Sequence, residues 1–166
     1  ILGAKFSNTL VVKNNESVFS EKKRYLSGAP LYVLAMYLVR RFREEMGSEF
    51  PLSFSGGINR DNFSEAVSCG LLPVTTCTDI LKKGGYARLH AYLQNLATDM
   101  QAVKAPHIAS FILRSAGYLE DQELHLAAQI NSGRVAAEAL KNPAYRLINN
   151  ARPPKKINST LTLFDC

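Results

Sequence analysis

The sequence predicts an α/β fold in which strands and helices alternate over roughly the first hundred residues. Three observations support this prediction. Short β-rich apolar runs recur, small or polar residues follow each run, and a segment with apolar residues at helical spacing comes next. Strands that alternate with helices form a parallel sheet with right-handed crossovers. The chain of 166 residues, with 46% hydrophobic and 20% charged residues, has the composition of an ordinary globular domain.

The first predicted unit is a strand within residues 2–13, followed by a helix that begins near Pro30. The polar residues 14–28 between them are predicted to form a loop. Pro30 suits the first turn of a helix, and Gly47 follows the last periodic residue, which predicts the helix end there. Apolar residues at 3.6-residue spacing predict the buried face of this helix. They are Leu31, Leu34, Ala35, Leu38, Val39, Phe42 and Met46.

The second and third units are shorter. A strand over residues 50–55 precedes a helix that Asn59 can cap and that ends near Gly70. A third strand is predicted over residues 71–76, and a third helix follows residue 85. The inner face of that helix is predicted from its apolar periodicity. Its members are Leu89, Leu93, Leu96, Ala97 and Met100.

From Lys104 onward the alternation ends. Two helices are predicted, separated at Gly117, with no strand pattern between them. These patterns divide the chain into a partial β/α unit, a helical extension and a linker. Their boundaries are residues 1–103, 104–150 and 151–166. The chain opens on Ile1 without a methionine and stops just after an apolar run, so we expect a fragment of a longer protein.

Charge and cysteine content restrict the function classes. The net charge is +6, but the basic group at residues 40–43 runs directly into Glu44 and Glu45, which is typical of a solvated helix face. The basic group at residues 22–24 has no aromatic residue within it, so no nucleic-acid partner is expected. No run approaches the roughly 18 apolar residues of a membrane span. Three cysteines, at positions 69, 77 and 166, fit neither a disulfide framework nor a zinc motif. With no signal peptide, a reduced cytoplasmic location is expected.

Small residues follow two neighbouring strands of the predicted sheet, at the point where each strand ends. Gly56 and Gly57 follow one strand, and Cys77 and Thr78 follow the next. Backbone N–H groups approach an anion closely where side chains are small, and a helix N-terminus favours negative charge. Two readings of the glycine pair stay open, a phosphate-binding loop and a turn that only needs positive φ. Cys77 is either an activated nucleophile or a small, half-buried residue that lines the loop. Cys69, at the end of a helix pattern, is expected to be a small buried hydrophobic residue.

Four motifs in order resemble the last three βα units of the dihydroorotate dehydrogenase-like flavin barrel, in the branch that contains dihydropyrimidine dehydrogenase. They are Asn8-Thr9, Leu26-Ser27-Gly28-Ala29-Pro30-Leu31, Ser55-Gly56-Gly57-Ile58 and Cys77-Thr78. The stretch from Thr76 to Leu89 is also similar to proteins described as selenate reductase subunits. Those are iron–sulfur flavoproteins whose later part resembles the glutamate synthase small subunit.

This resemblance implies the C-terminal βα units of a TIM-type (β/α)8 barrel with an FMN site at the C-terminal ends of its strands. It implies two sets of site residues. The FMN phosphate would be bound by Ser27, Gly28, Gly56, Gly57, Cys77 and Thr78. The substrate would be faced by Asn8 and Thr9, whose amide and hydroxyl groups can both donate and accept hydrogen bonds.

The resemblance also implies a longer parent oxidoreductase that carries iron–sulfur clusters, FAD and NAD(P)H besides FMN. Cys166 would begin an iron–sulfur ligand run in that parent only. Because only three of eight βα units are present and the catalytic loop of the family lies on earlier strands, the chain alone is expected to be inactive. No catalytic residue is assigned in it.

Two alternatives to the flavin reading remain. One is a structural or docking module whose degenerate barrel binds no flavin, and the other is a phosphate-binding α/β domain unrelated to flavin. In either case an open parallel sheet has unpaired edges. The expected partners are the remainder of its own polypeptide, or a second copy through the exposed edges. Residues 104–150 or the terminal segment could also cover them.

Overall fold

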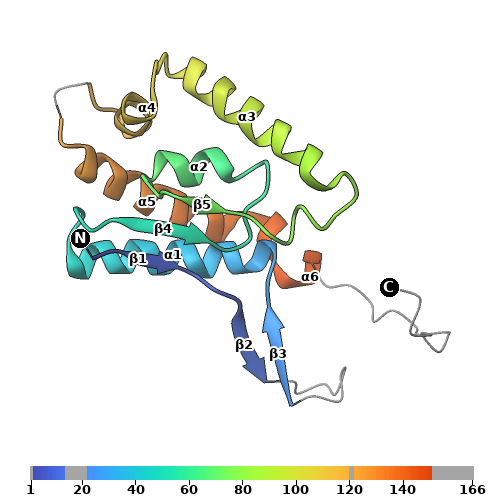
Figure 1. The fold of residues 1–166 in the computed structure, drawn as a ribbon. Helices are drawn as coiled ribbons and strands as arrows, with labels where there is room; N and C mark the ends of the chain where they lie inside the picture. Colours follow the sequence, from blue (N-terminus) through green and yellow to red (C-terminus); the bar gives the residue numbers. More distant parts are fainter. Residues whose placement is uncertain (1, 14–21, 120–121, 151–166) are drawn as a thin grey trace.

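The computed structural model describes residues 2–13, 22–119 and 122–150, and its centre is a three-stranded parallel sheet (Figure 1). The strand order is β1-β4-β5, with Phe6 opposite Phe54 and Phe54 opposite Val74. The alternating elements are β1 (Ala4–Phe6), α1 (Ala29–Met46), β4 (Leu52–Ser55), α2 (Phe63–Ser68), β5 (Val74–Thr75) and α3 (Leu89–Ala102). Three consecutive βα units with parallel pairing confirm the predicted fold class.

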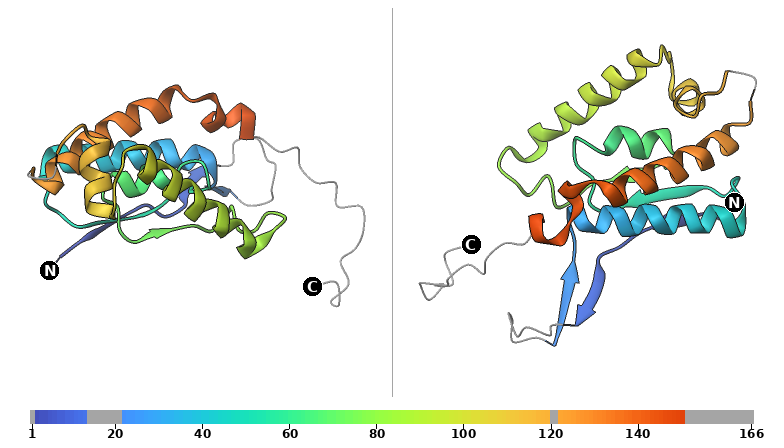
Figure 2. Two further views of the ribbon diagram at one scale, coloured as in Figure 1. Left: turned by 90° about the horizontal axis from the view of Figure 1, so that it is seen from above. Right: turned by 180° about the vertical axis from the view of Figure 1, so that it is seen from behind.

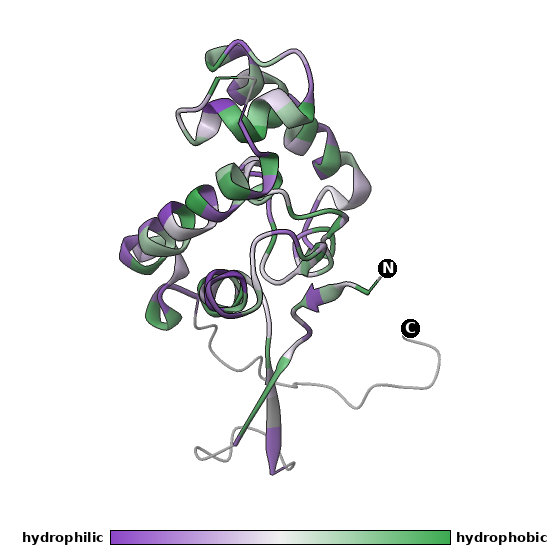
Figure 3. Ribbon diagram, turned by 90° about the vertical axis from the view of Figure 1, so that its left-hand side faces the viewer, coloured by the Kyte–Doolittle hydropathy of each residue, from purple (hydrophilic) through white to green (hydrophobic). Residues whose placement is uncertain are grey.

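The single strand predicted within residues 2–13 is in fact two separate strands. The prediction for residues 2–28 is corrected accordingly. β1 joins the parallel sheet, whereas β2 (Leu10–Lys13) pairs antiparallel with β3 (Lys23–Leu26). The prediction of a loop over 14–28 is therefore wrong at β3. This two-stranded ribbon extends away from the body (Figures 2 and 3). The lysines of its two strands therefore face solvent, as loop residues do, and Val11 and Tyr25 are exposed as well.

Helix α1 buries a wider arc than its predicted face. It contacts β1 on one side and α5 (Leu124–Lys141) on the other, so residues between the two contact lines are buried as well. Leu34, Leu38 and Met46 are exposed, contrary to the prediction. The buried residues of α1 are Pro30, Leu31, Tyr32, Ala35, Met36, Val39 and Arg43.

The second and third units differ from the prediction in their boundaries. Asn62 occupies the N-cap position of α2, and Asn59 lies three residues earlier in the preceding loop. β5 contains only two residues, because the predicted strand includes Pro73, which has no N–H to donate. On α3, Leu93 and Ala97 are exposed and Tyr92 is the buried side chain.

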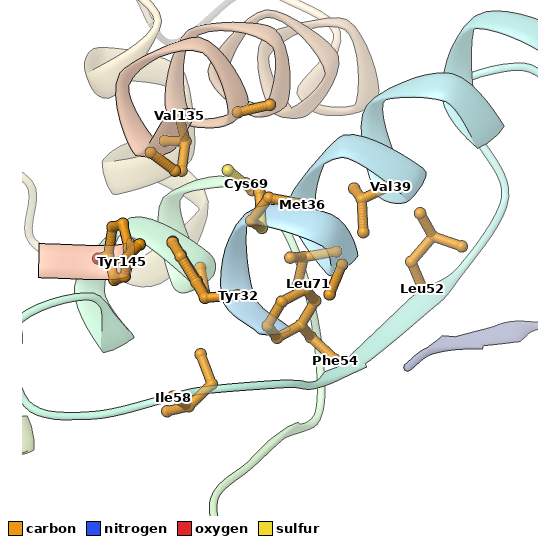
Figure 4. Close-up of a cluster of buried hydrophobic side chains, with 14 of the residues drawn as sticks. Tyr32, Met36, Val39, Leu52, Phe54, Ile58, Cys69, Leu71, Val135 and Tyr145 are labelled. Carbon is orange, nitrogen blue, oxygen red and sulfur yellow. The ribbon is translucent and has the colours of Figure 1, made fainter. Parts of the chain in front are cut away.

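The main core lies between the sheet and α1, and α5 closes it from the far side (Figure 4). The rings of Tyr32 and Phe54 meet edge to face with centroids 5.8 Å apart, and the ring of Tyr145 is tilted by 37° to that of Tyr32 with centroids 5.1 Å apart. Aromatic pairs at these separations add to the stabilisation from area burial. The core therefore joins the sheet to the helical extension through α1.

The helical extension consists of α4 (Ile108–Ser115), α5, the turn η2 (Pro143–Tyr145) and α6 (Leu147–Asn150). Its principal contacts are with α1 and α2, on the side of these helices away from the strands (Figure 2). The described part of the extension contributes no strand that pairs with β1 or β5, so the expectation that residues 104–150 cover the sheet edges stays a prediction. The predicted linker and Cys166 lie outside the described residues.

Within the described ranges, every helix is too short or too polar to cross a lipid bilayer.

Leu71 tests the core directly, because its side chain is completely buried within the main hydrophobic cluster. We expect Leu71→Ala to lower the free energy of unfolding by about 2–5 kcal/mol, through lost burial and the cavity left behind. Leu140→Ala on α5 is the matched control, since Leu140 is 72% exposed. Urea denaturation followed by circular dichroism measures both. Equal losses in the two variants would contradict this description of the core.

Candidate functional site

Four chain segments meet at the C-terminal ends of the three parallel strands and enclose a cavity of about 190 Å³. Residues 7–9 follow β1, and residues 27–29 lead into the first turn of α1. Residues 55–59 begin at the last residue of β4, and residues 75–79 begin at the last residue of β5. All eight site residues named from the sequence line this one cavity. They are Asn8, Thr9, Ser27, Gly28, Gly56, Gly57, Cys77 and Thr78.

Gly57 is the point where two of these segments touch. Its φ is +63°, and a Cβ at this position would lie 2.4 Å from the carbonyl oxygen of Gly28 and 2.9 Å from the backbone nitrogen of Tyr32. Both neighbours are backbone atoms, so neither can rotate away. Only glycine therefore allows the β4–α2 loop to lie against the first turn of α1.

Asn62 holds the same loop by two hydrogen bonds, and it was not identified as a site residue from the sequence. Its buried side chain donates from Nδ2 to the carbonyl oxygen of Gly57 at 3.1 Å and accepts from the backbone N–H of Asn59 at 2.8 Å. These two hydrogen bonds fix the carbonyl of Gly57 relative to the start of α2. The only sequence signal was an asparagine close to a predicted helix start.

Asp79 anchors the loop after β5, and it too was missed in the sequence. Its carboxylate accepts hydrogen bonds from Lys82 at 2.9 Å, from Arg88 at 3.0 and 3.1 Å, and from Tyr92 at 2.9 Å. The side chain is 3% exposed. Burial alone would raise the pKa of Asp79, but the donors from Arg88, Lys82 and Tyr92 outweigh it and lower the pKa to about 2.

The hydroxyl of Thr76 continues this network toward β4. It donates to the carbonyl oxygen of Ile58 at 3.1 Å and lies 3.2 Å from the hydroxyl of Tyr92. Tyr92 thereby connects α3 with the loops after both β4 and β5. The position of Cys77 and Thr78 consequently depends on α3 as well as on their own strand.

The two described cysteines differ in environment. Cys69 is fully buried, as predicted for a small hydrophobic residue, and burial raises the pKa of its thiol to about 11. Cys77 lines the cavity but is exposed, rather than half-buried as expected. Among the described residues, no group of three or more His, Cys, Asp or Glu side chains could hold a metal ion. His107 instead caps α4 by accepting from the N–H of Ser110.

The cavity is chemically suited to a phosphate group. The N–H groups of Gly57, Cys77 and Thr78 donate to no backbone carbonyl within the described residues, and the hydroxyl of Thr78 and the ammonium of Lys82 lie in the same lining. Such donors bind anions well. The volume, however, falls below the roughly 300 Å³ of a small-molecule pocket, so a nucleotide-sized ligand would be held here at one end only.

Comparison with known protein families agrees with this geometry. The family described as "Oxidoreductase YgfK, N-terminal TIM-barrel domain" matches residues 1–134. The chain belongs to this family. The matched range contains all three βα units and the whole cavity lining, so the YgfK family supports the TIM-barrel reading and places the chain in an oxidoreductase family.

Two curated relatives are named "Putative oxidoreductase YgfK", one from Escherichia coli strain K12 and one from Escherichia coli O157:H7. Each is 33% identical to the chain over 94 residues, which cover 57% of this chain and 9% of the relative. The chain thus aligns with a small part of these YgfK proteins. No solved structure matches it.

Alanine substitutions at Gly57 and Gly85 distinguish the destabilisation caused by a steric clash from that caused by a positive φ alone. We expect Gly57→Ala to lower the free energy of unfolding by more than about 3 kcal/mol, because the added Cβ meets two backbone atoms that cannot yield. Gly85→Ala is the control, since Gly85 also has a positive φ but has nothing within 4 Å of an added Cβ. In Gly85→Ala the left-handed backbone conformation alone should lower the free energy of unfolding by about 1 kcal/mol. Equal losses in thermal or urea denaturation would contradict the contact.

The Asp79 network predicts a pH dependence of stability. The pKa of Asp79 is about 2 in the folded protein, against about 3.9 in an unfolded chain. The carboxylate therefore contributes about 2 kcal/mol above pH 4, and this contribution disappears as the pH falls toward 2. We expect Asp79→Asn to remove most of that slope in urea denaturation between pH 4 and pH 2. Asp61→Asn, at an exposed carboxylate, should leave the slope in place.

Proposed function

We propose that the cavity at the strand ends binds the phosphate of FMN, and that the chain is the phosphate-binding part of a flavin barrel. The main support is that four sequence motifs, from three successive βα units, line a single cavity. Position supports the proposal as well, because barrels of this type place their chemistry at the C-terminal ends of their strands.

Each group in the cavity has a proposed role. The N–H groups of Gly57, Cys77 and Thr78 donate to phosphate oxygens, and the Thr78 hydroxyl adds one further donor. The ammonium of Lys82 supplies positive charge beside its partner Asp79. Ser27 and Gly28 complete the lining at the start of α1.

Asn8 and Thr9 are proposed to face the substrate from the end of β1. The side-chain oxygen of Asn8 accepts from the N–H of Thr9 at 2.8 Å, which orients the amide locally. FMN, when bound, supplies hydride transfer, and the residues of this chain supply orientation and charge. None of them is assigned a catalytic role.

The parent protein is proposed to be a cytoplasmic iron–sulfur flavoprotein of the selenate reductase or glutamate synthase small-subunit type, with FAD and NAD(P)H as further cofactors. Membership of an oxidoreductase family and the 9% coverage of the relatives support a longer polypeptide. Its remainder is the proposed partner for the free sides of β1 and β5, with a second copy as the other option. Cys166 would act as an iron–sulfur ligand only in that parent.

The alternative is a docking module that binds no flavin. The parent polypeptide decides between the two when it is purified, denatured and assayed for released FMN by fluorescence. One FMN per polypeptide at this site supports the proposal. A correctly folded parent that releases no FMN, and takes up none on incubation, overturns it.

Thr78→Val removes one phosphate donor and keeps the size of the side chain. We expect it to weaken FMN binding by the parent protein about 10- to 100-fold, because a hydrogen bond to a charged group contributes about 1.5–3 kcal/mol. Riboflavin, which has no phosphate, should lose little affinity. Thr98 lies on α3 outside the cavity, so the control Thr98→Val should change neither the FMN affinity nor the riboflavin affinity. An equal loss for FMN and riboflavin would contradict the phosphate assignment.

A further inference from the structure

Arg43, near the end of α1, is a buried cation for which the described residues provide no carboxylate partner. The residue is only 3% exposed. Its Nη1 donates to the carbonyl oxygen of Ala128 at 2.7 Å and to the hydroxyl of Ser132, both on α5. Its Nε is buried and has no acceptor. Within the described part of the chain, the acceptors of this charge are therefore two neutral groups, a carbonyl and a hydroxyl.

An uncompensated buried charge is costly. A guanidinium stays protonated in proteins, and taking it out of water costs several kcal/mol unless an opposite charge is close. Burial lowers the pKa of Arg43, as expected for a cation without a counter-charge. An anion at this position would therefore gain more from Arg43 than it would from a solvated arginine.

Arg43 also lines a cavity of about 460 Å³. The cavity lies at the N-terminal ends of β4 and β5, so it is at the opposite end of the strands from the phosphate cavity. Most of its wall is apolar, drawn from the loops before β4 and β5 and from α4 and α5. These apolar residues include Phe50, Leu52, Leu72, Ile112 and Leu124.

The acidic groups near this cavity do not neutralise Arg43. Glu49 belongs to the lining, but its side chain is 84% exposed and lies 3.8 Å from Nε2 of His125. Glu123 is likewise directed to His125, at 3.1 Å. Arg43 therefore has no counter-charge among the described residues, although it borders the cavity.

We propose that this cavity binds a small monocarboxylate with an apolar body. A single uncompensated charge fits a monovalent anion, and a guanidinium matches the planar geometry of a carboxylate. The apolar wall suits a hydrocarbon body and disfavours a strongly hydrated phosphate. The volume lies within the range of small-molecule sites. The two cavities share no residue, so this binding site and the FMN site can be tested independently.

Hexanoate is a suitable probe, and hexanamide is its neutral counterpart. We expect isothermal titration calorimetry of the protein at pH 7 to show saturable hexanoate binding in the millimolar range or tighter, and much weaker binding of hexanamide. Arg43→Gln should weaken hexanoate binding roughly tenfold or more. Arg40→Gln is the matched control, because Arg40 is on the same helix but is exposed and paired with Glu44.

A second variant tests the site if Arg43→Gln does not fold. Leu124→Trp fills the cavity from α5 and leaves Arg43 in place, so it should also reduce hexanoate binding. Three results would each overturn the proposal: no saturable hexanoate binding, equal affinity for hexanoate and hexanamide, or unchanged affinity in Leu124→Trp or in folded Arg43→Gln. FMN binding should be unaffected in all variants that fold.

Discussion

The candidate site depends on one close contact between two stretches of backbone. Gly57 lies so near the first turn of α1 that an added Cβ would be 2.4 Å from the carbonyl oxygen of Gly28. This contact determines the distance between the loop after β4 and the segment before α1. Because both sides are backbone, the spacing cannot be adjusted by side-chain rotation. Asn62 then fixes the carbonyl of Gly57 by a hydrogen bond, and the loop after β5 completes the cavity.

The parts of the site that follow from local sequence were predictable. Small residues after successive strands signalled loops at the same sheet edge, since parallel strands direct their C-terminal ends the same way. The residues that hold those loops were not predictable in this way. No sequence motif selected Asp79, because only the fold brings Arg88 and Tyr92 onto its carboxylate. Asp79 is buried because it pairs with residues further along the chain, and the spacing of apolar residues in the sequence carries no information on such pairs.

Helix α1 shows a second limit of sequence patterns. A single apolar stripe predicts a helix that packs on one surface, but α1 packs on β1 and on α5 together. The second contact buries Arg43, whose guanidinium donates to Ala128 on α5, while Leu34 and Leu38 remain exposed. A charged residue at position 43 naturally reads as a solvated one. Its burial requires α5, whose position no pattern in the first hundred residues could reveal.

The geometry also explains why the chain would hold a ligand at one end only. Three parallel strands bring together three loop ends, and these close a cavity of about 190 Å³. That volume suits an anionic group, whereas a complete nucleotide needs walls beyond it. β1 and β5, at the two sides of the sheet, have no further strand among the described residues. In a closed barrel those two sides are where the neighbouring strands pair, and their loops would border the same cavity. The phosphate end of a ligand could thus be fixed by these residues, while its reacting end would be determined by strands that pair at β1 and β5.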